Sequence, residues 1–173
     1  MLKDFNIQKY LDKKPPSNNS FTTMQEIKEL KKTPINKNFV KEKDNIKKSF
    51  TNIVDEGKFI QSLIDESAPI ILKIKKHHNR PRPKKLAKKL GIKIEDIEMQ
   101  SMKTPSYPSG HSAQGMFIGM ALSDKYPSKR NKLMKTARDI SKSRNMAHAH
   151  YKSDSKFGEE IGRDMYNEFK NKI

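Results

Sequence analysis

The chain has 173 residues, of which 33% are hydrophobic, so it is about long enough for one domain and has no apolar run of the length that crosses a membrane. It contains no cysteine, which excludes disulfides, thiol nucleophiles and cysteine-based metal sites. Its 37 lysines and arginines exceed its 20 aspartates and glutamates, and the net charge is +17. This charge predicts attraction to a phosphomonoester, a nucleic acid or an anionic membrane.

The amino-terminal segment, residues 1–50, is predicted to be a basic extension. Its first ten residues interleave polar and apolar side chains and lack the continuous hydrophobic segment of an export signal, which favours a cytoplasmic location. A short helix is expected over residues 24–32, with Thr23 as its cap and Glu26 completing a capping box. The composition leaves open whether the extension covers a site, mediates self-association into a homo-oligomer or stays disordered.

Residues 51–173 are predicted to form one domain of amphipathic helices, because hydrophobic residues there recur three and four positions apart. Ser67 and Pro69 resemble the cap and first turn of a separate helix. No segment alternates in the manner of a β-strand, so the fold class is predicted to be all-α, a helical bundle. Helical series are expected at residues 50–64, 70–78, 84–90, 116–122, 133–146 and 154–170.

Three motifs collect cations, histidines and a carboxylate. The first is Lys-x6-Arg-Pro, with Lys75 and Arg82; the second is Pro-Ser-Gly-His, ending at His111. The third is Ser-Arg-x5-His-x3-Asp, which contains His150 and Asp154. Each motif alone is weak, but the three in this order resemble the phosphatidic acid phosphatase type 2 (PAP2) superfamily. That superfamily includes bacterial non-specific acid phosphatases and vanadium haloperoxidases.

The resemblance covers roughly residues 55–165 and implies a soluble phosphatase of the acid phosphatase type that needs neither a metal nor a cofactor. It implies that His150 attacks phosphorus to give a phosphohistidine, while His111 protonates the leaving group and then activates water. Asp154 lies four residues after His150, on the same helical face, where its carboxylate can bind one ring nitrogen. The resemblance assigns phosphate binding to Lys75, Arg82, Ser109, Gly110 and Arg144.

These residue types suit phosphoryl transfer, which depends mainly on positioning and on stabilising charge at the phosphate oxygens. Arg82 and Arg144 can each offer paired N–H donors, whereas Lys75 supplies a mobile point charge. Ser109 and Gly110 lie where a helix is expected to begin, and free backbone N–H groups at a helix start bind anions. The partner expected is therefore a phosphorylated small molecule.

The first motif has two possible registers, because Lys73 with Arg80 has the same spacing as Lys75 with Arg82. Members of the family commonly have a basic residue two positions before the motif arginine. Arg80 supplies that residue if Arg82 belongs to the motif, so we favour the second register.

Two other functions compete with the phosphohistidine enzyme. His148, His150 and Asp154 also resemble part of a zinc or manganese site, which would make a metal-dependent phosphohydrolase, although the neighbouring cations disfavour a divalent ion. Alternatively, the lysine-rich helices form a non-enzymatic module that binds nucleic acid or an anionic surface weakly. Vanadate in place of phosphate would allow haloperoxidase chemistry, which the sequence does not exclude.

Overall fold

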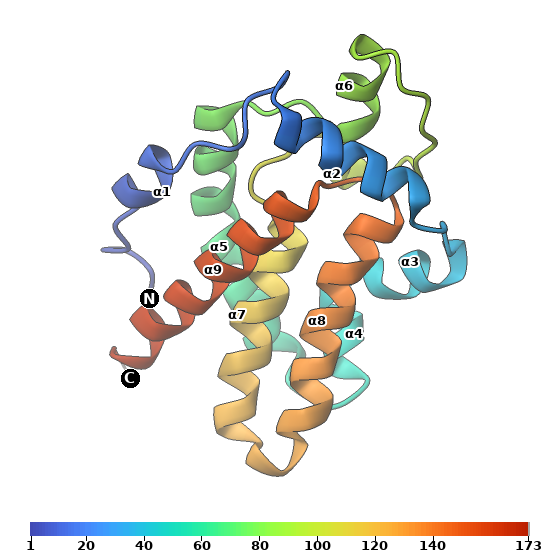
Figure 1. Cartoon of the computed structure of the whole chain (residues 1–173). Coiled ribbons are helices and arrows are strands. Elements are labelled where there is room, and N and C mark those ends of the chain that lie inside the picture. Colours follow the sequence, from blue (N-terminus) through green and yellow to red (C-terminus); the bar gives the residue numbers. More distant parts are fainter. Residues whose placement is uncertain (173) are drawn as a thin grey trace.

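A computed structural model describes residues 1–172, and this part of the chain contains helices but no strands (Figure 1). The prediction of an all-α fold is therefore confirmed. The α-helices are α1 (Gln8–Asp12), α2 (Phe21–Lys32), α3 (Lys37–Asp44), α4 (Ile46–Thr51), α5 (Gly57–His78), α6 (Pro83–Lys89), α7 (Gly110–Lys125), α8 (Arg130–Met146) and α9 (Lys152–Lys170). Two 3₁₀ turns, η1 (Gln100–Lys103) and η2 (Pro127–Lys129), complete the set.

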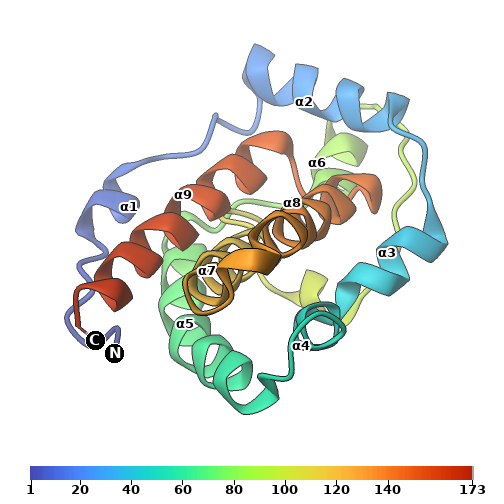
Figure 2. The ribbon, with the colours of Figure 1, turned by 90° about the horizontal axis from the view of Figure 1, so that it is seen from below.

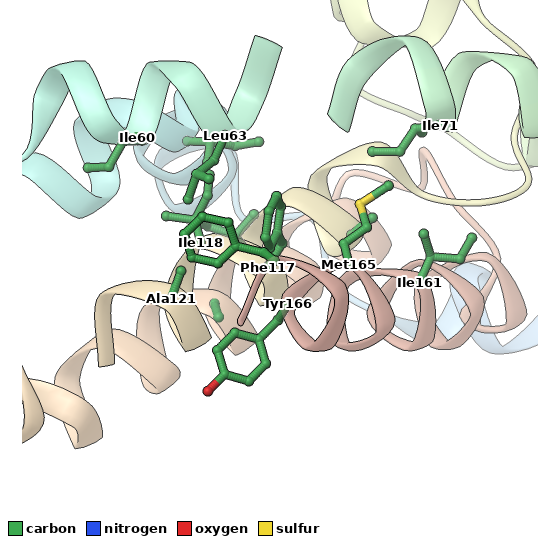
Figure 3. Close-up of a cluster of buried hydrophobic side chains, with 14 of the residues drawn as sticks. Ile60, Leu63, Ile71, Phe117, Ile118, Ala121, Ile161, Met165 and Tyr166 are labelled. Carbon is green, nitrogen blue, oxygen red and sulfur yellow. The ribbon is translucent and has the colours of Figure 1, made fainter. Parts of the chain in front are cut away.

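The centre of the bundle is α7, which packs against α8 and α9 most extensively and against α5 as well (Figure 2). Apolar side chains lie on every side of α7, as expected of a helix that is covered all round. Figure 3 shows Phe117 and Ile118 of α7 among side chains from α5 and α9. Burial of these apolar groups supplies the main driving force for assembling the bundle.

Glycines let α9 approach α7 very closely. A β-carbon on Gly158 would collide with the carbonyl oxygen of Ser109, and one on Gly162 would collide with that of Ala113. Only glycine fits at such a close backbone approach. The glycines thus hold the beginning of α9 against the beginning of α7, where the second and third motifs lie.

The helix α5 continues through Pro69, so the prediction of two helices separated at Ser67 is wrong. Proline removes one helical hydrogen bond. Buried Ile60 and Leu63 before the proline and Ile71 after it keep one continuous apolar face. Burial of that face offsets the lost bond, and Ser67 donates to the carbonyl of Leu63 within the helix instead of capping a new one.

The helices of the extension lie around the outside of the bundle (Figures 1 and 2). Tyr10 of α1 and Phe50 of α4 are buried in the main core, and Ile27 of α2 packs with Leu86 and Tyr151. The cap of α2 is Ser20, whose Oγ accepts from the N–H of Thr23, so the prediction of Thr23 as the cap is wrong.

Of the nine α-helices in residues 1–172, none is long and apolar enough to pass through a membrane.

Candidate active site

His150 lies in the turn that precedes α9 and is almost fully buried. Its Nδ1 is 3.0 Å from Oδ2 of Asp154, and its Nε2 is 2.9 Å from Nη1 of Arg82. A carboxylate accepts and a guanidinium donates, so Nδ1 carries the proton and Nε2 presents its lone pair. The unprotonated ring nitrogen therefore faces the cation of the first motif.

The carboxylate of Asp154 is fully buried and accepts from several donors besides His150. The N–H of Tyr151 lies 3.1 Å from Oδ2, the hydroxyl of Ser106 also donates to Oδ2, and Nη1 of Arg80 lies 2.7 Å from Oδ1. Burial raises the pKa of Asp154 to about 6, and the charge of Arg80 opposes that rise. At neutral pH the group is therefore an ionised acceptor that fixes the ring of His150.

The first-motif cations near His150 are Lys75 and Arg82. Nζ of Lys75 donates to the hydroxyl of Thr104 at 3.0 Å, and Nε of Arg82 donates to the Thr104 carbonyl at 2.9 Å. Lys73, by contrast, is exposed, and Arg80 is buried behind Asp154, where it stacks on the ring of Tyr151. This arrangement brings the second register, not the first, to His150.

The cations make the pocket strongly positive. Burial lowers the pKa of Lys75 to about 7 with help from the charge of Arg82, and burial lowers the pKa of Arg82 to about 10. Burial, together with Arg82, Lys75 and Arg144, holds the pKa of His150 well below its usual range. His150 is consequently a neutral imidazole at physiological pH, the protonation state that a nitrogen nucleophile requires.

Ser109 and Gly110 stand at the beginning of α7. Oγ of Ser109 caps the helix by accepting from the N–H of Ser112 at 3.2 Å, and a hydroxyl that accepts there can still donate its own proton. A β-carbon on Gly110 would lie 3.8 Å from Cε of Lys75. The free N–H end of α7 is therefore beside a cation of the first motif.

His111 and Arg144 meet at a residue that the sequence did not single out, Asp44 at the end of α3. Nε2 of His111 is 2.8 Å from the main-chain carbonyl oxygen of Asp44, and Nη1 of Arg144 is 3.1 Å from its Oδ1. Burial lowers the pKa of His111, and the hydrogen bond with Asp44 opposes this effect. Nη2 of Arg144 is buried and has no hydrogen-bond partner among residues 1–172, so it is available to an additional acceptor.

The structure does not bring His148 to the other members of the alternative metal site. Its Nδ1 lies 2.7 Å from the carbonyl of Glu95 and its Nε2 lies 2.8 Å from the carbonyl of Thr33. In the described part of the chain, no group of three or more histidine or acidic side chains is arranged to hold a metal ion. His148 instead connects the extension to the loop before α7.

Sequence reasoning noted Thr104 and Ser106 only as part of the family-like segment before the second motif, and it did not predict their contacts with Lys75 and Asp154. It also did not predict Arg80 as the partner of Asp154. It also missed a groove of about 850 Å³ beside Arg82. Its apolar lining includes Ile92 and Met102, and its lysines include Lys84, Lys85, Lys88, Lys93 and Lys103.

Comparison with known proteins identifies the family of the chain. The PAP2 superfamily model matches residues 60–163. A relative from Salmonella typhimurium described as a non-specific acid phosphatase is 34% identical over 88 residues, which are 51% of this chain and 35% of the relative. The chain thus spans about a third of the length of that relative. The family match includes the three motifs and the helices that carry them, and the chain therefore belongs to the PAP2 superfamily.

Proposed function

We propose that this protein is a phosphatase that hydrolyses phosphomonoesters of small molecules through a phosphohistidine on His150. The observation that carries the proposal is the placement of His150, whose Nδ1 lies 3.0 Å from Oδ2 of Asp154 and whose Nε2 lies 2.9 Å from Nη1 of Arg82. These partners favour a proton on Nδ1 and a lone pair on Nε2. A nucleophile directed toward the cations that would bind a phosphoryl group suits in-line attack on phosphorus. The name of the Salmonella relative supports the same class of reaction.

In the first step, the phosphate oxygens bind Lys75, Arg82 and Arg144, together with the N–H groups at the beginning of α7. Nη1 of Arg82 shifts from Nε2 of His150 to a phosphate oxygen, which frees the lone pair. The N–P bond forms while the bond from phosphorus to the leaving oxygen breaks, and Asp154 stabilises the positive charge that develops on the ring. His111 donates its proton to the departing oxygen.

In the second step, the neutral His111 accepts a proton from water, and the resulting hydroxide attacks phosphorus. The N–P bond breaks, inorganic phosphate leaves, and His150 returns to its initial protonation state. Acid–base assistance of this kind is worth about 10²–10⁴-fold in rate. The proposed reaction uses side chains of the protein, main-chain N–H groups of α7 and water.

The test is turnover of p-nitrophenyl phosphate by the purified protein and by His150→Ala, with His77→Ala as the control. His77 is an exposed histidine outside the pocket. We expect His150→Ala to lose at least about 10³-fold in kcat/KM and His77→Ala to retain full activity. Quenching the wild type in alkali, where phosphohistidine survives, should trap labelled phosphate on the protein but not on His150→Ala.

Added vanadate should inhibit the wild type, and a chelator should leave its turnover unchanged. Full activity in His150→Ala would remove that residue as the nucleophile. Loss of turnover on chelation would favour the metal-dependent alternative. Gel shifts with nucleic acid that persist at high salt, in a protein without turnover, would favour the binding module.

A further inference from the structure

Asp44 is a charged residue of the extension that reaches the candidate site. It ends α3, and its carboxylate is 3.1 Å from Nη1 of Arg144 and 3.5 Å from Nε2 of His111. Its main-chain oxygen is closer to His111, at 2.8 Å from Nε2. The extension therefore contacts one side chain of the second motif, His111, and one of the third motif, Arg144.

The carbonyl contact determines where His111 carries its proton. A main-chain oxygen can only accept, so Nε2 of His111 must be the donor. The carboxylate of Asp44 adds a negative charge beside that N–H. This charge favours the protonated ring, whereas burial and the positive charge of Arg144 favour the neutral one. Asp44 thus supplies the negative charge that favours the protonated form of His111 beside the cation of Arg144.

The other elements around His111 bring positive charge or none. Arg144 comes from α8, and Lys75 of α5 packs against the residue that precedes His111. His150, before α9, lies close enough for its pKa to respond to His111. On α3, Lys43 pairs with Glu42, and the buried face of α4 consists of Ile46, Ser49 and Phe50. Asp44 is the carboxylate among the groups that act on His111.

We infer that Asp44 is a positioning residue that keeps the proton on Nε2 of His111, so that the extension completes the general acid. This inference rests on the proposed phosphatase function. As the bond between His150 and phosphorus forms and the ester bond breaks, the leaving oxygen replaces the Asp44 carbonyl as the partner of Nε2 and takes its proton. His111 becomes neutral, and the alcohol leaves uncharged.

The test compares two leaving groups in Asp44→Asn, which keeps the main-chain carbonyl and removes the charge. p-Nitrophenolate is a stable anion and departs without a proton, whereas the alkoxide of glycerol 2-phosphate needs one. We expect kcat/KM for glycerol 2-phosphate to fall by about tenfold or more, relative to the value for p-nitrophenyl phosphate. As the pH rises, the ratio of kcat/KM for glycerol 2-phosphate to that for p-nitrophenyl phosphate should begin to fall at a lower pH in Asp44→Asn than in the wild type.

Two further variants separate positioning from general damage. Glu42→Gln removes an exposed carboxylate from the same helix, and its ratio should equal that of the wild type. Asp44→Glu keeps the charge and should recover part of the ratio lost in Asp44→Asn. An equal loss with both substrates, or an unchanged ratio in Asp44→Asn, would overturn the inference. A wild type without activity on either substrate would instead overturn the proposed function on which it rests.

Discussion

His150 and His111 each contact an aspartate that also binds an arginine, but the two aspartates differ in burial. His150 binds Asp154, which also binds Arg80, and we call this set the inner triad. His111 contacts Asp44, which also binds Arg144, and we call this set the outer triad. The inner carboxylate is fully buried, whereas the side chain of Asp44 is 48% exposed.

The comparison shows how one fold places the proposed acid and the proposed nucleophile, which are both histidines, in different environments. Burial raises the pKa of Asp154, whereas the hydrogen bond from His111 and the charge of Arg144 lower the pKa of Asp44. His150 faces cations on the side away from its carboxylate and stays neutral. His111 is held through the nitrogen that carries its proton. The two environments thus suit the two different tasks that we propose for these histidines.

The largest expected effect comes from breaking the inner triad with Asp154→Asn. The amide can place an N–H where Nδ1 of His150 needs an acceptor, so the ring changes tautomer and Nε2 loses its lone pair. We expect kcat/KM for p-nitrophenyl phosphate to fall by about 10³–10⁴-fold. Arg80 keeps Glu26 as a charged partner, so the variant should fold, which circular dichroism can check. A loss of less than about tenfold would show that the inner triad is not the functional one.

A smaller effect is expected from Lys75→Met, which tests the cation beside the inner triad. Because the pKa of Lys75 is lowered to about 7, its charge is present below that pH and is lost above it. Wild-type kcat/KM should therefore fall as the pH rises above about 7. The variant should be about 10–100-fold less active at pH 6, since it lacks a charged hydrogen bond to phosphate.

In Lys75→Met, the decline in kcat/KM between about pH 6.5 and 8.5 should also be smaller than in the wild type. The matched control is Lys73→Met, which removes an exposed lysine from the same helix and should leave the profile unchanged. If Lys73→Met lost activity and Lys75→Met kept it, the first register of the motif would be favoured instead.

The two triads also differ in what the sequence could predict. In the inner triad, His150 and Asp154 are only four residues apart, so their contact is local and the spacing predicts it, although His150 lies in the turn before α9 and not in the helix. In the outer triad, Asp44 lies 67 residues before His111 and 100 before Arg144. The packing of α3 and α4 against α7 and α8 brings them together, and no periodicity or local spacing predicts that packing.

The same distinction between local spacing and long-range packing explains which predictions about the helices were correct. The amphipathic pattern predicted the all-α fold, whose elements repeat locally. It did not predict that α5 continues through Pro69, because the continuity of that helix depends on burial against α7 and not on the low helix propensity of proline. It also suggested Glu26 for a capping box, whereas the carboxylate binds Ser153 and Arg80 across the molecule. In both cases a local sequence preference is overridden by contacts with residues far away in the sequence.

The smallest expected effect, from Glu26→Gln, sharpens the comparison, because Glu26 is the carboxylate by which the extension reaches the inner triad. Its oxygens accept from the N–H of Ser153 at 2.6 Å and from Nη2 of Arg80 at 3.2 Å. The substitution weakens a buried charged contact, and we expect the free energy of unfolding to fall by about 1–3 kcal/mol.

Arg80 and Asp154 remain paired in Glu26→Gln, so kcat/KM should change by less than about threefold and its ratio between the two leaving groups should not change. Urea unfolding measures the first effect and the two-substrate assay the second. Glu29→Gln, which alters an exposed carboxylate on the same helix, is the control and should affect neither. If Glu26→Gln shifted the leaving-group ratio as Asp44→Asn is expected to, the contacts of the extension with both triads would affect proton transfer to the leaving group. An effect confined to stability would mean that its inner contact is structural and that proton control belongs to the outer triad.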